Sequence, residues 1–301
     1  MLFCKINCIK KLIFCWLPGV AIGVGYLLAA TAWAQQTTTT TPTLTKNKSE
    51  IQPPDTQENK SYSVQLKRQQ ILAPEIQQHE VIWLDTSIGK WLSLYHQDET
   101  GKRKGILIIV PDDNLGITQS ATLNKLSLAV PQTGWSSWII AMPHQQTISN
   151  IKARQEDKLK RQEAYTKLKI EILQQAINQV PTKDKTSIFV LLHGNNFQLF
   201  NRSVLDNIHG VILLNLIDIK EKRLADSFSE LTLSILEIAG NKINHLPLEV
   251  LKHRKSVAKS SDINYRQIIY PTADLNFSHL ELILSRTITG WLNKLKETTD
   301  K

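Results

Sequence analysis

Continuous apolar runs that alternate with helical segments constrain the fold of this chain more than any other feature. Six of these runs are strand-like, because each is short, rich in β-branched residues and bounded by turn residues. They cover residues 105–110, 138–142, 187–192, 210–215, 232–238 and 266–270. Runs without polar alternation are typical of strands that are covered on both faces. The pattern therefore predicts a mostly parallel sheet with helices on both sides.

Helical periodicity fills most of the gaps between these runs, because apolar residues recur there at spacings of three and four. We expect helices near residues 120–130, 151–179, 196–207, 247–258 and 278–296. Two further strand-like runs, Val81–Leu84 and Trp91–Tyr95, flank a turn at Gly89 and predict an N-terminal antiparallel hairpin. We therefore expect one α/β domain over residues 62–297, with a sheet of about eight strands.

The first 34 residues have the pattern of a secretory signal peptide. Three lysines precede an uncharged apolar run over residues 12–30, and Ala32-Trp33-Ala34 provides small residues for cleavage. All three cysteines lie in this segment, so we expect an exported chain without disulfides, in the bacterial periplasm. The alternative is an uncleaved inner-membrane anchor over residues 12–34, because the apolar run is long enough to span a bilayer.

Residues 35–61 are rich in Thr and Pro and poor in apolar residues, which predicts a flexible linker. The chain carries a formal net charge of +9. Because basic residues are not interleaved with aromatic residues in a stripe, and because export is expected, we exclude a nucleic-acid partner. The highly charged segment over residues 152–163 predicts a solvated helix or a weak contact with an anionic surface.

Four features resemble the α/β-hydrolase superfamily, within which the chain is similar to exported bacterial proteins of unknown function. They are Gly105–Pro111, Gly134-Trp135 before a second run that ends at Pro143, the turn His193-Gly194-Asn195, and the terminal segment Arg286–Leu292. The resemblance spans residues 62–297 and implies an antiparallel start followed by a parallel sheet. It also implies a nucleophile after the fifth strand, an acid after a late strand and a histidine after the last strand.

The resemblance implies three catalytic positions, and at two of them this chain carries a residue that cannot play the catalytic role. An active hydrolase carries Gly-x-Ser-x-Gly on its nucleophile turn, whereas Gly194 stands at the serine position here. Asn241 stands at the acid position and His279 meets the histidine position. Glycine has no attacking atom, and an asparagine cannot stabilise an imidazolium as a carboxylate does. The sequence therefore favours a non-catalytic protein over a divergent hydrolase that uses His279 with a displaced acid or nucleophile.

Five polar residues near the expected nucleophile turn are candidates for binding: Asp112, Asp113, His193, Asn195 and Asn196. The two carboxylates fall in the expected oxyanion loop, where they would repel developing negative charge. They could instead cap the next helix, hold a cation or do acid–base work. Nucleotide and metal motifs are absent, so we expect no cofactor and no metal. We expect a binding or structural component of the bacterial envelope, whose partner is a small molecule or an envelope protein.

Overall fold

The computed structural model describes residues 54–144, 155–181, 186–217, 225, 227–230, 233–240 and 246–299. The predicted signal peptide and the candidate acid position Asn241 lie outside these residues. Within the described part of the chain, no helix is both long enough and apolar enough to cross a membrane.

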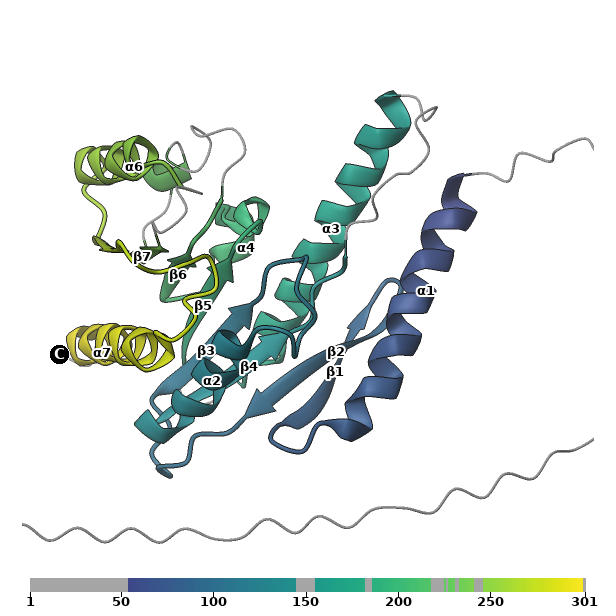
Figure 1. The fold of residues 1–301 in the computed structure, drawn as a ribbon, viewed down its shortest axis with the longest axis horizontal. Coiled ribbons are helices and arrows are strands. Elements are labelled where there is room, and N and C mark those ends of the chain that lie inside the picture. The colour runs from purple at the N-terminus through teal and green to yellow at the C-terminus, as the bar shows by residue number, and fades with distance from the viewer. Residues whose placement is uncertain are drawn as a thin grey trace, which may run out of the picture. The chain divides into compact units, whose positions relative to one another are not determined.

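One eight-stranded sheet organises the described residues, in the order β1-β2-β4-β3-β5-β6-β7-β8. β1 pairs antiparallel with β2, and β2 pairs antiparallel with β4, whereas every other neighbouring pair is parallel. The strands are β1 (Glu80–Thr86), β2 (Gly89–His96), β3 (Gly105–Val110), β4 (Trp135–Ile140), β5 (Ser187–His193), β6 (Gly210–Leu214), β7 (Ser234–Gly240) and β8 (Tyr265–Tyr270). The predicted mostly parallel sheet with an antiparallel start is confirmed (Figure 1).

The helices are α1 (Pro54–Leu72), α2 (Ala121–Ala129), α3 (Gln155–Gln179), α4 (Arg202–Leu205), α6 (Leu248–Ser260) and α7 (Glu281–Thr299). Short 3-10 turns lie at Ala73–Glu75, Pro131–Thr133, Phe197–Leu199 and Ser227–Glu230. Among the helices, two differences from expectation are large. α1 begins at Pro54, inside the stretch predicted to be a linker, and the helix expected over residues 196–207 is divided into a 3-10 turn and α4.

Helices cover both faces of the sheet, as hydrogen bonds from alternate strand residues show. In β4, Trp135 Nε1 donates to Asn293 Oδ1 of α7 at 2.9 Å, and Ser137 Oγ donates to the Ser127 carbonyl of α2 at 2.6 Å. Side chains two residues apart point to the same face, so α2 and α7 share one face. The strand register places Glu237, which bonds to α6, on the opposite face.

The central strands form the core because they present no polar face to solvent. Every residue of β3, β4, β5 and β6 is buried, which accounts for their mostly apolar character. Trp135 packs edge-on against Phe189, which in turn packs against Trp291 of α7. Gly105 permits this packing, because a Cβ there would lie 2.5 Å from the Trp135 ring and 2.4 Å from the Ser187 carbonyl oxygen.

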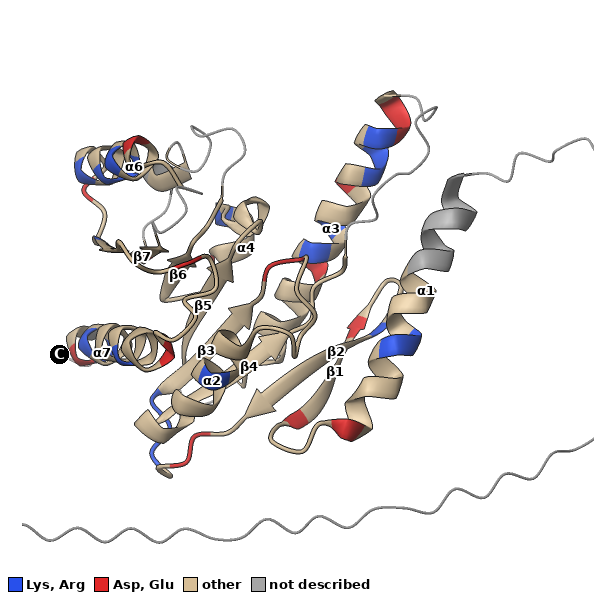
Figure 2. Ribbon diagram, in the orientation of Figure 1, with Lys and Arg blue, Asp and Glu red and all other residues tan. Residues whose placement is uncertain are grey.

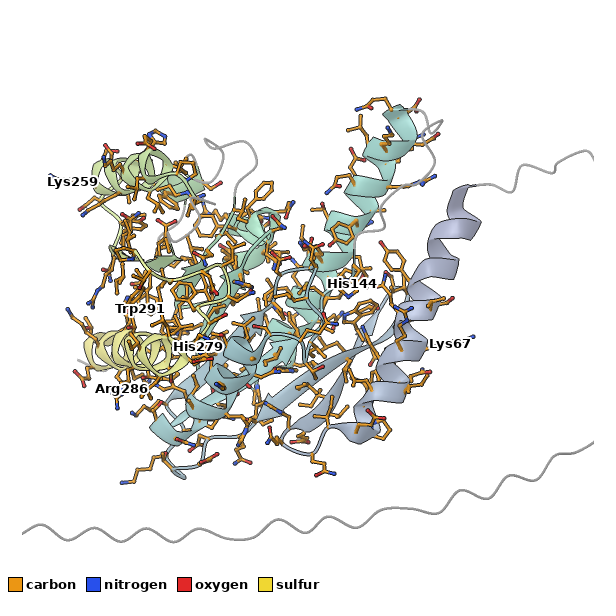
Figure 3. The ribbon with its side chains drawn as sticks, in the orientation of Figure 1. Lys67, His144, Lys259, His279, Arg286 and Trp291 are labelled. Carbon is orange, nitrogen blue, oxygen red and sulfur yellow. The ribbon has the colours of Figure 1, made fainter. Side chains whose placement is uncertain are left out.

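Helix α1 runs beside the antiparallel end of the sheet (Figure 1). Two glutamines, one turn apart, attach it to backbone groups. Gln65 donates from Nε2 to the His144 carbonyl at 3.3 Å and accepts from the His144 amide at 3.1 Å. Gln69 Oε1 accepts from the Leu92 amide of β2 at 2.9 Å. His144 accordingly lies between α3 and α1 in Figure 3.

Candidate functional site

The turn after β5 lies where the sequence resemblance places the nucleophile elbow. Gly194 follows His193 directly and has a φ of 65°, a left-handed conformation that favours glycine. Its amide donates to the Leu214 carbonyl at 3.2 Å, and its carbonyl accepts from the Ile217 amide at 2.9 Å. The turn is therefore fixed at the carboxyl edge of the parallel strands, next to the end of β6.

The Asp112 carboxylate fills the space into which a side chain at position 194 would project. A Cβ built on Gly194 would lie 1.7 Å from Asp112 Oδ2 and 2.6 Å from Asp112 Cγ. Asp112 Oδ2 accepts from the Asn195 amide at 2.9 Å, and Oδ1 accepts from the Asn114 amide at 2.9 Å. Asp112 comes from the loop after β3, so two loops that are distant in sequence interlock at this point.

The same contact occupies an amide that hydrolases use in catalysis. In α/β hydrolases the amide after the nucleophile is one donor of the oxyanion hole, and here the corresponding Asn195 amide is bound to Asp112. Burial acts to raise the pKa of Asp112, but hydrogen bonds that include those from the Asn114 and Asn195 amides outweigh it and lower the pKa. An ionised carboxylate of the chain itself therefore sits on this donor.

His193 is a buried link between loops. Its Nδ1 accepts from the Asp112 amide at 3.3 Å, so the ring proton is on Nε2, which faces the Leu275 carbonyl at 3.3 Å. Burial lowers the pKa of His193 and outweighs the opposing effects of the Leu275 carbonyl and Asp112. The imidazole is thus neutral near pH 7, and both of its nitrogens are engaged in holding the loops after β3 and β8.

The Asp113 carboxyl group lies in a buried cluster with helix α3. Its Oδ2 lies 2.6 Å from the Tyr165 hydroxyl and 3.4 Å from Lys169 Nζ. Lys169 Nζ also lies 3.4 Å from the Asn195 carbonyl. Burial raises the pKa of Asp113 despite the nearby Lys169 and Tyr165. The helix-cap interpretation of these aspartates is wrong, because Ser120 accepts from the Leu123 amide and caps α2.

Sequence reasoning missed Tyr165 and Lys169, although one signal was present. Lys169 is flanked on α3 by Leu168, Ile172 and Leu173, all of which are buried. A lysine within such an apolar stripe needs a buried partner, because an unpaired ammonium in the core is costly. The pattern could have indicated a buried carboxylate, but it does not indicate which one.

The two remaining turn residues differ in accessibility. Asn195 is partly exposed and contributes its backbone to the contacts with Asp112 and Lys169. Asn196 is fully buried, and its Nδ2 donates to the Pro111 carbonyl at 2.6 Å and the His193 carbonyl at 2.8 Å. Asn196 therefore ties the end of β3 to the end of β5, and its amide hydrogens do not face a ligand.

Asn215, which sequence analysis also missed, closes the next part of this edge. It follows β6 with a φ of 45° and donates from Nδ2 to the Leu275 carbonyl at 2.8 Å. Its Oδ1 accepts from the Gly240 amide at 2.6 Å. A Cβ on Gly240 would lie 2.6 Å from the Asp274 carbonyl oxygen. The loop after β8 is therefore packed closely onto the ends of β6 and β7.

His279 is exposed, has a φ of 66° and lies in the turn before α7 (Figure 3). Within the described part of the chain, no hydrogen bond or ion pair joins its ring to Gly194 or Asp112. Asp274, an acid five residues before His279, accepts from the amides of Asn276 and Ser278 at 3.0 and 2.9 Å. Residues 54–299, apart from their gaps, contain no group of three potential metal ligands.

The charged segment predicted over residues 152–163 is described from Gln155, where α3 begins. Its acidic residues Glu156, Asp157 and Glu163 match its basic residues Lys158, Lys160 and Arg161 in number. Lys160 Nζ lies 3.0 Å from Glu156 Oε1, one turn away. Figure 2 shows both signs of charge on the N-terminal half of α3. This part of the segment is a solvated helix with balanced charge.

Comparisons with known proteins agree with this architecture. Residues 20–169 match the family described as "Protein of unknown function (DUF3530)". None of the curated proteins matches the chain in sequence. Est1E from Butyrivibrio proteoclasticus has a TM-score of 0.55 and 10% identity, and the match covers 71% of this chain and 98% of Est1E.

Two further solved structures are similar over nearly their whole length. Dienelactone hydrolase from Anabaena variabilis has a TM-score of 0.54 and 11% identity, with coverage of 72% of this chain and 99% of the hydrolase. An α/β serine hydrolase without a lid, from Xanthomonas campestris, has a TM-score of 0.52 and 10% identity, with coverage of 73% and 95%. These structures show that the chain has the α/β-hydrolase fold, as the sequence resemblance implies.

Proposed function

We propose that this chain is a non-catalytic protein with the α/β-hydrolase fold. The observation that carries the proposal is the Asp112 carboxylate, which occupies both the space above Gly194 and the Asn195 amide. Acyl transfer through a covalent intermediate needs an attacking oxygen and a free oxyanion donor. Here the attacking side chain is replaced by hydrogen, and a negative charge occupies the donor.

The working role that we propose is binding or structural, in the bacterial envelope. The signal-like residues 1–34 and the Thr/Pro-rich stretch after them support export to the periplasm, with anchoring through residues 12–34 as the alternative. The partner would be an envelope protein or a small molecule. Because the described residues 155–163 of the charged segment carry balanced charge, an anionic surface would bind them only weakly.

A cavity next to α1 offers a place for a small molecule. It lies between α1 and the β1–β2 turn and is lined by Tyr62, Ser63, Leu66, Ser87 and Ile88. The lining combines hydroxyl groups with apolar side chains, as in sites for small amphipathic ligands. Binding there would leave the interlocked loops around Gly194 unchanged.

The test is an activity measurement on the full chain with two reagents. We expect no labelling by a fluorophosphonate probe and no hydrolysis of p-nitrophenyl esters above the rate in buffer. His279→Ala is compared with His253→Ala, since both histidines are exposed. Turnover that His279→Ala abolishes and His253→Ala preserves would replace this proposal with the divergent hydrolase.

A further inference from the structure

A compact group of ionisable side chains lies behind Asp112, and the proposed function does not use it. Asp113 from the β3–α2 loop meets Tyr165 and Lys169 from α3. The Lys169 side chain is 1% exposed and the Asp113 side chain 8%. Asp112 on the same loop, His193 of β5 and Tyr62 of α1 are the other titratable groups that act on this cluster. The protonation states of such a group are constrained, because buried charges must be balanced.

The Tyr165 hydroxyl makes two short contacts with oxygen atoms, but it has only one hydrogen to donate. The Tyr165 hydroxyl lies 2.6 Å from Asp113 Oδ2 and 2.9 Å from the Pro143 carbonyl oxygen. Both partners would be acceptors if Asp113 were ionised, yet a hydroxyl group donates only one hydrogen. With a proton on Asp113, the carboxyl group donates to Tyr165, and Tyr165 donates to Pro143. Both short contacts are then true hydrogen bonds.

The charge count leads to the same state. Asp112 and Asp113 share a site with one ammonium group, that of Lys169. The distance of 3.4 Å from Lys169 Nζ to Asp113 Oδ2 exceeds the 2.7–2.9 Å that is usual for charge-assisted bonds. When two carboxyl groups share a site, one of them keeps its proton. Asp112 has the amide donors of Asn114 and Asn195, so it is the group that ionises.

We propose that Asp113 is a neutral carboxylic acid near pH 7 and that, with Tyr165 and Lys169, it forms a latch that holds Asp112 on the turn after β5. The latch joins three elements, because Asp113 belongs to the β3–α2 loop, Tyr165 and Lys169 belong to α3, and Lys169 reaches the Asn195 carbonyl. Ionisation of Asp113 would place two negative charges side by side. Asp112 would then leave the Asn195 amide, and the space above Gly194 would open.

The burial-raised pKa of Asp113 and the lowered pKa of Asp112 agree with this assignment. This proposal does not depend on the proposed lack of catalysis, because it concerns only which group holds a proton. Its test therefore uses no substrate, and either proposal can fail while the other stands.

The first experiment detects the proton by the infrared C=O band of a protonated carboxyl group at pH 7 in the full chain. We expect this band in the wild type and its loss in Asp113→Asn. The band should persist in Lys169→Met, because removal of the ammonium favours the neutral acid further. The exposed Asp262→Asn is the matched control and should leave the band unchanged.

An ordinary ion pair between Asp113 and Lys169 gives the opposite pattern. The wild type would then show no band, and Lys169→Met would create one by removing the countercharge. That result overturns the proposal. If Lys169→Met does not fold, the comparison of the wild type with Asp113→Asn decides alone, because Asp113→Asn keeps the shape of the neutral acid.

The second experiment measures urea unfolding as a function of pH in the wild type and Asp113→Asn. The folded pKa of Asp113 lies above its unfolded value of about 3.9. The stability that its proton contributes is full below the unfolded value and is lost as the pH rises through the folded pKa. We expect Asp113→Asn to lack this loss. Parallel pH profiles for the two proteins would contradict the latch.

Discussion

Replacement of Gly194 by alanine is expected to lower the free energy of unfolding by about 2–4 kcal/mol, from overpacking together with backbone strain. The new Cβ would lie 1.7 Å from Asp112 Oδ2, so the carboxylate must leave its place. In addition, the alanine would have to adopt the φ of 65° that Gly194 has, a conformation that residues with a side chain rarely adopt. Urea unfolding of the variant, compared with the wild type at the same pH, measures the effect.

Two further variants separate the contact from the general effect of losing a glycine. Gly290→Ala in α7 adds a Cβ that meets nothing within 4 Å, and a gain of about 0.5–1 kcal/mol is expected from helix propensity. In the background of Asp112→Ala, the Gly194→Ala change should cost less, because the clashing group is absent. A Gly194→Ala protein as stable as the wild type would mean that Asp112 does not fill this space.

Arg254→Met is expected to destabilise the fold by about 3–5 kcal/mol, because it leaves a buried carboxylate without its cation. Arg254 NH1 donates to Glu237 Oε1 at 2.6 Å and to the Leu216 carbonyl at 3.1 Å. The side chains of Arg254 and Glu237 are at most 1% exposed. Gln267 also donates to Glu237 Oε2, at 2.8 Å, but it is neutral and cannot balance the charge. Thermal and urea unfolding would report the loss.

The matched control is the exposed pair of Arg202 and Asp206, whose atoms are 3.8 Å apart. Arg202→Ala should change the free energy of unfolding by less than about 1 kcal/mol. Glu237→Leu combined with Arg254→Met should recover much of the loss, because two apolar side chains leave no unbalanced charge. Equal effects of Arg254→Met and Arg202→Ala would contradict the interpretation of Glu237 as a buried ion.

The strands could be predicted because burial on both faces leaves a direct mark on the sequence. The exception is informative. β4 was expected over residues 138–142 but begins at Trp135, because Ser136 and Ser137 appear polar in a window that is fully buried. Their hydroxyl groups find partners, as in the bond from Ser137 Oγ to the Ser127 carbonyl. Periodicity alone cannot detect such pairing, since the partner lies on another element.

The site was predictable as a location and less so as an arrangement. Gly194 and Asp112 were both singled out from the sequence, but nothing local indicates that they touch, because they are joined by the packing of the loops after β3 and β5. Asn215 and Lys169 act through backbone carbonyls of distant loops. Contacts of this kind depend on the three-dimensional path of the chain and leave no pattern in neighbouring residues.

The attachment of α1 determines how mechanical load would enter the domain. A pull from the N-terminal side of Pro54 would load this helix first, and with it the side-chain bonds of Gln65 and Gln69 to backbone groups. These bonds join the helix to Leu92 of β2 and to His144 in the segment after β4. We therefore expect a stretched chain to release α1 before its eight-stranded sheet unfolds.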